Sequence, residues 1–230
     1  MPATCPTSTQ LAAVATSNAA FQQAALGYFN GIRLPASLIA GSSVAAVFSL
    51  LQQARDSTGL SPTEVWILRL YHVSAILSFV LSMTTVTTTT TASTLLLLGK
   101  SFSEVPHIDV YHFLRGELNL EFVLTRWAFL SSIITFLTGV TSRILLELHL
   151  CRPNRRITGV MVTGFMTSIV TGLLGLMNQS LNCWPNWWYM TMEVAQLLWQ
   201  RTVLSKSVLL PLSMASLGVA IACVGRLAWH

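Results

Sequence analysis

One charged pair inside a long apolar stretch is the first candidate for chemistry in this sequence. Arg143 and Glu147 are four residues apart, so on a helix they lie one turn apart and can form an ion pair. Ser131 and Thr135 continue the same stripe at the same spacing. Ionisable groups inside a membrane helix commonly mark an ion or proton pathway. The stripe can therefore be a path for an ion or small solute, or a structural pair joining helix ends.

The position of Arg143 favours the structural interpretation. It lies some eight residues, on the order of 12 Å, beyond the middle of the expected helix. A long arginine side chain can extend from such a position to the lipid headgroups. We therefore expect a structural ion pair, and keep the ion or solute path as the alternative.

A run of hydroxyl side chains between Thr84 and Thr94 is the second candidate. Hydroxyls around the whole circumference of a helix could line a wet or ion-conducting surface. Alternatively, each threonine donates a hydrogen bond to the carbonyl three or four residues earlier, and the helix packs through these side chains. We favour the second interpretation, because serine and threonine commonly mediate helix contacts in bilayers.

Histidines raise the question of a bound metal or haem. His72 and His149 fall on the same membrane side in the topology given below, and two imidazoles can ligate a haem iron, which leaves a haem-binding membrane protein as a remote alternative. His107 and His112 are five residues apart and do not share one helix face, which argues against a metal site there. We predict no cofactor and no metal ion.

Signatures of catalysis are absent from the sequence. It contains no Gly-x-Ser-x-Gly, no His-Glu-x-x-His and no phosphate-binding glycine loop. Its four cysteines are far apart, without the Cys-x-x-Cys spacing of a redox or zinc motif. We predict no catalytic residue and expect a protein that is not an enzyme.

The composition indicates that lipid, and not water, surrounds most of this chain. Of 230 residues, 53% are hydrophobic and only 9% are charged, against roughly 25% charged in soluble domains. The formal net charge of +5 comes from scattered cations, which fit loop orientation and anionic lipid better than a nucleic acid. The sequence therefore predicts an integral membrane protein with the lipid bilayer as its main partner.

The expected fold is an all-α, polytopic membrane helix bundle with about five transmembrane helices. Residues 1–33 form an N-terminal amphipathic, interfacial segment, which ends at the break signal Asn30-Gly31, and Pro35 then falls in the first turn of a new helix. Residues 34–230 form the transmembrane helical domain. Its spans are predicted at about 34–51, 73–98, 122–148, 157–176 and 208–227.

Loop charge gives the orientation of these spans. The connection between the third and fourth spans holds Arg152, Arg155 and Arg156 and no acid, so we place the Arg152–Arg156 loop on the cytoplasmic, stromal or matrix side. The loop from Gly99 to Glu121 is richer in acids and falls on the opposite side.

Small residues repeat every four positions in three spans, a spacing that lets helix backbones approach closely. They are Ser37, Gly41 and Ala45; Gly164, Ser168 and Gly172; and Gly218 and Ala222. We therefore predict a non-enzymatic structural or assembly subunit that packs through these faces against other membrane subunits or a second copy. The alternative is a small channel or carrier that uses the threonine-rich span and the Arg143/Glu147 stripe.

Overall fold

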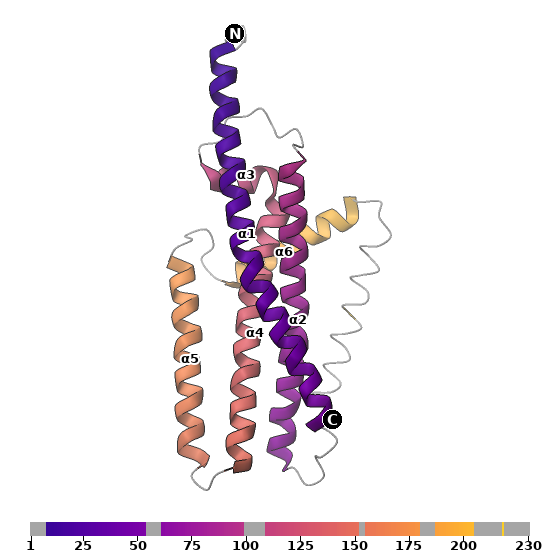
Figure 1. Ribbon diagram of the computed structural model, residues 1–230, viewed down its shortest axis with the longest axis vertical. Coiled ribbons are helices and arrows are strands. Elements are labelled where there is room, and N and C mark those ends of the chain that lie inside the picture. Colours follow the sequence, from indigo (N-terminus) through magenta and orange to yellow (C-terminus); the bar gives the residue numbers. More distant parts are fainter. Residues whose placement is uncertain are drawn as a thin grey trace. The chain divides into compact units, whose positions relative to one another are not determined.

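The computed structural model describes residues 8–53, 61–98, 109–151, 155–179 and 187–204, together with residue 218. Every element in these ranges is an α-helix, which confirms the all-α prediction for this part of the chain. The helices, coloured along the sequence in Figure 1, are α1 (Ser8–Gln53), α2 (Pro62–Leu97), α3 (Val110–Glu117), α4 (Asn119–Cys151), α5 (Arg155–Gln179) and α6 (Trp187–Leu204).

Three of these helices are long and apolar enough to cross a membrane. The candidate spans are Ala19–Phe48, Pro62–Leu97 and Asn119–Glu147, with 30, 36 and 29 residues. At ~1.5 Å per residue, each exceeds a hydrocarbon core of ~30 Å. A shorter apolar helix, Ile157–Gly172, lies within the predicted fourth span. The predicted fifth span, 208–227, lies outside the described residues except for Gly218.

The helix break predicted at Asn30-Gly31 is wrong. The chain continues from Ser8 to Gln53 as one helix, with Pro35 in its interior. A proline removes one backbone hydrogen bond and bends a helix, and Figure 1 shows α1 changing direction part-way along its length. Membrane helices tolerate such prolines where neighbouring helices support them. Packing against other helices stabilises α1 at Asn30-Gly31, where the local sequence favours a helix end.

The apolar face expected to place the N-terminal segment on lipid is packed inside the protein. Ala25 and Phe29 are fully buried, and the Tyr28 ring lies 5.5 Å from the ring of Phe122 at the start of α4. Ala25 and Phe29 therefore mark the side of this stretch that packs on protein. Its apolar side is covered by protein.

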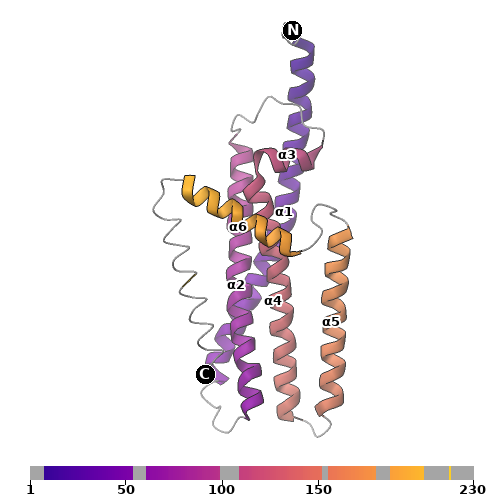
Figure 2. The ribbon, with the colours of Figure 1, turned by 180° about the vertical axis from the view of Figure 1, so that it is seen from behind.

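The chain divides into two compact units, each of which takes part of α2 and of α4. The first comprises Met1–Ser57 and Ala75–Phe136, and the second Thr58–Ser74 and Leu137–His230. In the first unit, both views place the short helix α3 beside α1 (Figures 1 and 2). In the second unit, both views show α6 running across the direction of α5.

A single hydrogen bond fixes the register of α1 against α2 in the first unit. Ser43 Oγ–H donates to Ser78 Oγ (3.1 Å), and both side chains are buried. Because the two helices run antiparallel, steps of seven residues along α2 correspond to steps of seven back along α1. Extended along the pair, this register leads us to infer that further buried residues face one another: Ala36 and Thr85, Phe29 and Ala92, and, four residues on, Ala25 and Leu96. Each pair contains at least one small residue, so the helices can approach closely.

Candidate functional site

The last turns of α4 hold the charged pair of the second unit. Arg143 Nε lies 2.8 Å from Glu147 Oε1, with the two side chains 27% and 59% exposed. Arg143 also packs on α2: its Cζ lies 5.9 Å from the centre of the Tyr71 ring. The pair expected from the spacing is present, and its guanidinium also makes a cation–π contact with a neighbouring helix.

Tyr71 is the partner that the sequence did not reveal. Its side chain is buried and lies beneath Arg143. The adjacent His72 directs Nδ1 to the carbonyl of Leu68 at 2.8 Å on its own helix. A tyrosine about two and a half turns after a helix start gives no sequence signal for such a contact. The contact between Arg143 and Tyr71 joins the end of α4 to the first turns of α2.

Another ionisable side chain, Glu64, caps the start of α2. Ser61 N–H donates to Glu64 Oε2 (2.8 Å), and Glu64 N–H lies 3.4 Å from Ser61 Oγ, which is the reciprocal pattern of a capping box. Pro62 occupies the first helical position, where its missing N–H costs nothing. Glu64 is mostly buried, and the cap gives its carboxylate a hydrogen-bond partner there.

Ser131 and Thr135, the other half of the predicted stripe, lie on the part of α4 that belongs to the first unit. Thr135 Oγ1–H bonds to carbonyls of its own helix, at 2.9 Å from Ser131 O and 3.0 Å from Ser132 O. Ser131 is buried, and its hydroxyl has no hydrogen-bond partner among the described residues. Ser131 and Thr135 therefore belong to one compact unit, and Arg143 and Glu147 to the other.

The threonine run of α2 is bonded to its own backbone. Every threonine from Thr84 to Thr94 donates to the carbonyl four residues earlier, at distances of 2.7 to 2.9 Å. This confirms the prediction of back-bonded threonines. Because the hydroxyls are satisfied within the helix, the run mainly presents methyl groups to its surroundings.

Hydroxyl contacts join three helices of the first unit. Ser43 donates to Ser78, whose Oγ–H in turn donates to Ser132 O on α4 (3.3 Å). Closer to the other end of α2, Thr88 Oγ1 and Thr125 Oγ1 lie 3.0 Å apart. These polar contacts connect α1, α2 and α4. The signal that could have revealed them is the seven-residue spacing of small and hydroxyl side chains shared by α1 and α2.

The small-residue faces predicted to pack are uncovered where the structure describes them. Their exposed members are Ser37, Gly41, Ala45, Gly164, Ser168, Gly172 and Gly218. A Cβ built on any of these glycines meets no atom within 4 Å in the described part of the chain. On α1, the buried small residues are shifted by one position, to Ala36 and Ala40. Ala222 lies outside the described residues.

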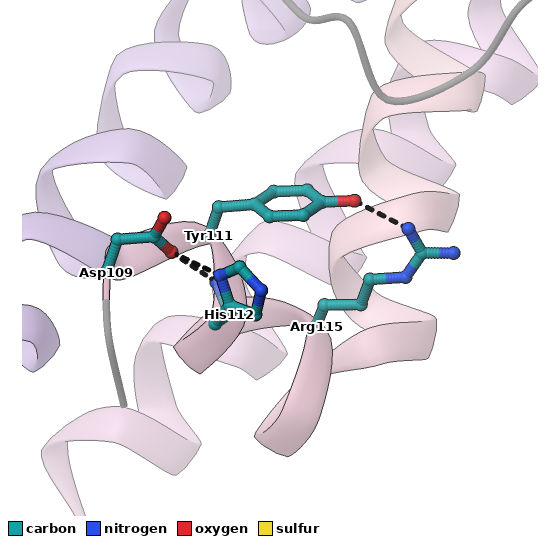
Figure 3. A network of polar contacts seen from close by, with 4 residues as sticks. All are labelled: Asp109, Tyr111, His112 and Arg115. Atoms are coloured by element: carbon teal, nitrogen blue, oxygen red, sulfur yellow. Dashed lines mark hydrogen bonds and ion pairs between the residues drawn. The ribbon is translucent and has the colours of Figure 1, made fainter. Parts of the chain in front are cut away.

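The short helix α3 presents a small polar network, drawn in Figure 3. Asp109 caps it: Oδ1 accepts from His112 N–H (2.7 Å) and lies 2.9 Å from His112 Nδ1. The His112 backbone N–H is the main reason that the pKa of Asp109 is lowered, with the His112 side chain adding to it. Arg115 Nη1 donates to the hydroxyl of Tyr111 (2.6 Å).

These contacts explain the polar residues of α3 as helix-capping and packing groups. Phe113 and Leu114 are buried on its other side, so α3 is amphipathic and docks by its apolar face. No group of three His, Cys, Asp or Glu side chains that could hold a metal ion occurs within the ranges that the structure describes. His107 and the side chain of His149 lie outside them.

The chain matches no known protein family, no curated protein and no solved structure. The interpretation of its function therefore depends on the geometry of the helices. That geometry consists of polar groups that pack helices together inside each unit, and of small-residue faces that are bare.

Proposed function

We propose that this chain is an integral membrane protein that acts as a non-enzymatic structural or assembly subunit. It binds the lipid bilayer through its long apolar helices, and other membrane subunits or a second copy through its small-residue faces. The observation that carries the proposal is the bare surface of α5. In the same proposal, the Arg152–Arg156 connection faces the cytoplasm, stroma or matrix.

Helix α5 touches the rest of its unit along a single line. Its half-buried residues are Thr158, Gly159, Val162, Met166 and Val170, and none of its described side chains is buried. A Cβ on Gly159 would lie 3.5 Å from Leu145 on α4, which marks this line as the side that faces α4.

The opposite side of α5 combines small residues with large apolar ones. Gly164, Ser168 and Gly172 form a shallow stripe there, and Met161 and Phe165 beside it are more than two-thirds exposed. Nearby Thr163, Thr167 and Thr171 are bonded to their own helix carbonyls. A second membrane helix could therefore approach this side closely without burying an unsatisfied hydroxyl.

The test is to fill the stripe and follow the partners. Gly164→Leu adds a large side chain at the centre of the bare surface, and Thr163→Leu adds a leucine at its edge as the matched control. Native co-purification in mild detergent, followed by mass spectrometry, should show lost subunits or a lost homo-oligomer for Gly164→Leu only. A native chain that purifies as a lone monomer from its own membrane would contradict the proposal.

A small channel or carrier is the second candidate, and one observation favours it. Ser82, Ser93 and Ser131 of the first unit are buried, and their hydroxyls have no hydrogen-bond partner in the described ranges. Such groups are where internal water or a polar solute binds. Flux into liposomes that is abolished by Ser82→Ala or Glu147→Gln would support transport, and absence of flux from the native chain would exclude it.

A further inference from the structure

Helix α6 carries a stripe of large aromatic and apolar side chains that its own unit does not cover. Met190 and Val194 are buried against the unit. Trp188, Met192 and Trp199 are 60%, 54% and 68% exposed, and with Ala195 they follow one another at spacings of four, three and four residues. This spacing keeps all of them on one face of the helix.

A second, polar stripe runs beside the first along the same helix. It consists of Tyr189, Glu193, Gln196 and Gln200, again at spacings of four, three and four residues. The helix thus has three sides: one packed on protein, one formed by tryptophan and methionine, and one polar. A helix that crossed a bilayer would have to bury this continuous polar side in hydrocarbon, which is unfavourable.

We propose that α6 lies in the plane of the membrane interface, with the Trp188–Trp199 face in contact with lipid at headgroup depth. The occupant of the exposed stripe is the bilayer, because indole rings prefer this level, where one edge is apolar and the other wet. The polar stripe then faces water, as in other interfacial helices. The 18 residues of α6 span about 27 Å, and α6 is not among the helices apolar enough to cross.

The inference rests on the proposed residence of the chain in a membrane, and the experiment separates the two. Spin labels are attached to single cysteines in the full chain in liposomes, after Cys5, Cys151, Cys183 and Cys223 are replaced by serine. The labelled variants are Met192→Cys and Trp199→Cys on the stripe, Gln196→Cys on the polar side, and Val80→Cys on the exposed surface of α2. Collision with oxygen and with a water-soluble nickel chelate gives the depth of each label.

We expect equal, shallow depths for the labels at 192 and 199, and a label at 196 that collides mainly with nickel. If α6 crossed the bilayer, the two stripe labels would differ in depth by about 10 Å, seven residues at ~1.5 Å each. That difference would overturn the inference about α6 but not the proposed function. Stripe labels in water, with the label at 80 in lipid, would do the same. A label at 80 that is also in water overturns the proposed function. Ala195→Cys replaces Trp199→Cys if the latter does not fold.

Discussion

The Ser78 hydroxyl joins three helices, so its removal is the most direct test of how the first unit is packed. It accepts from Ser43 at 3.1 Å and donates to Ser132 O at 3.3 Å. Both distances exceed the usual 2.7–2.8 Å of an O–H···O bond, so each bond should contribute at the low end, about 0.5 kcal/mol. Ser78→Ala should therefore lower the free energy of unfolding by about 1 kcal/mol. The loss stays small because Ser43 can turn to a carbonyl of its own helix.

The assay is SDS-induced unfolding from mixed micelles, followed by far-UV circular dichroism. Thr87→Ala is the matched control. Within the part of the chain that the structure describes, this exposed hydroxyl bonds only to carbonyls of its own helix, those of Met83 and Thr84, so its loss should change stability by less than about 0.5 kcal/mol. The double mutant of Ser43 and Ser78 should show a coupling of about 0.5 kcal/mol, because the two single changes remove one shared bond.

A larger side chain at the same position tests the steric part of the argument. The register places Ser78 opposite Ser43, so a leucine has no space between the helices and Ser78→Leu should cost about 1–3 kcal/mol. If Ser78→Leu were as stable as the native chain, or if Ser78→Ala and Thr87→Ala had equal effects with no coupling to Ser43, the packing deduced for α1 and α2 would be wrong.

Three further predictions concern other parts of the molecule. Phe29→Ala opens a cavity at a fully buried position and should cost about 3–5 kcal/mol, whereas Leu34→Ala at a 67% exposed position should cost far less in the same SDS titration. Tyr71→Leu removes the ring beneath Arg143 and should cost about 0.5–1 kcal/mol; a change indistinguishable from zero would show that the cation–π contact contributes nothing. Because the pKa of Asp109 is lowered in the folded state, its cap on α3 is fully effective above the unfolded-state pKa and is lost as the pH falls through the lower folded-state pKa. Hydrogen exchange should therefore show α3 amides losing protection in acid in the native chain but not in Asp109→Asn, which caps without titrating; equal loss in both would refute it.

Helix content and the bonding of the threonine run were predictable from the sequence because they depend on local chemistry. Apolar length predicted long apolar stretches within α1, α2 and α4, although the candidate span on α1 begins at Ala19 and not near residue 34 as predicted. The threonine hydroxyls from Thr84 to Thr94 bond to their own helix, which requires only a carbonyl four residues earlier.

The predictions that failed or were incomplete depend on tertiary contacts. Asn30-Gly31 and Pro35 read as a helix boundary, but packing of Ala25 and Phe29 supports a continuous α1. The predicted packing face contains Ser37, whereas the buried face contains the neighbouring residue Ala36. Which of these two faces is covered depends on where the partner helix lies. Tyr71 under Arg143 could not be foreseen either, because the contact joins residues more than seventy positions apart.

The register between α1 and α2 also has a consequence for how the protein is made. The side chains that fit these two helices together are all present once Leu98 has been synthesised, and none of them comes from α4. A slip by one heptad would leave the Ser43 hydroxyl facing Thr85 and would remove Phe29 from the position inferred for it opposite the small Ala92. We therefore expect this hairpin to close first, during translation, and to serve as the template on which the following helices assemble.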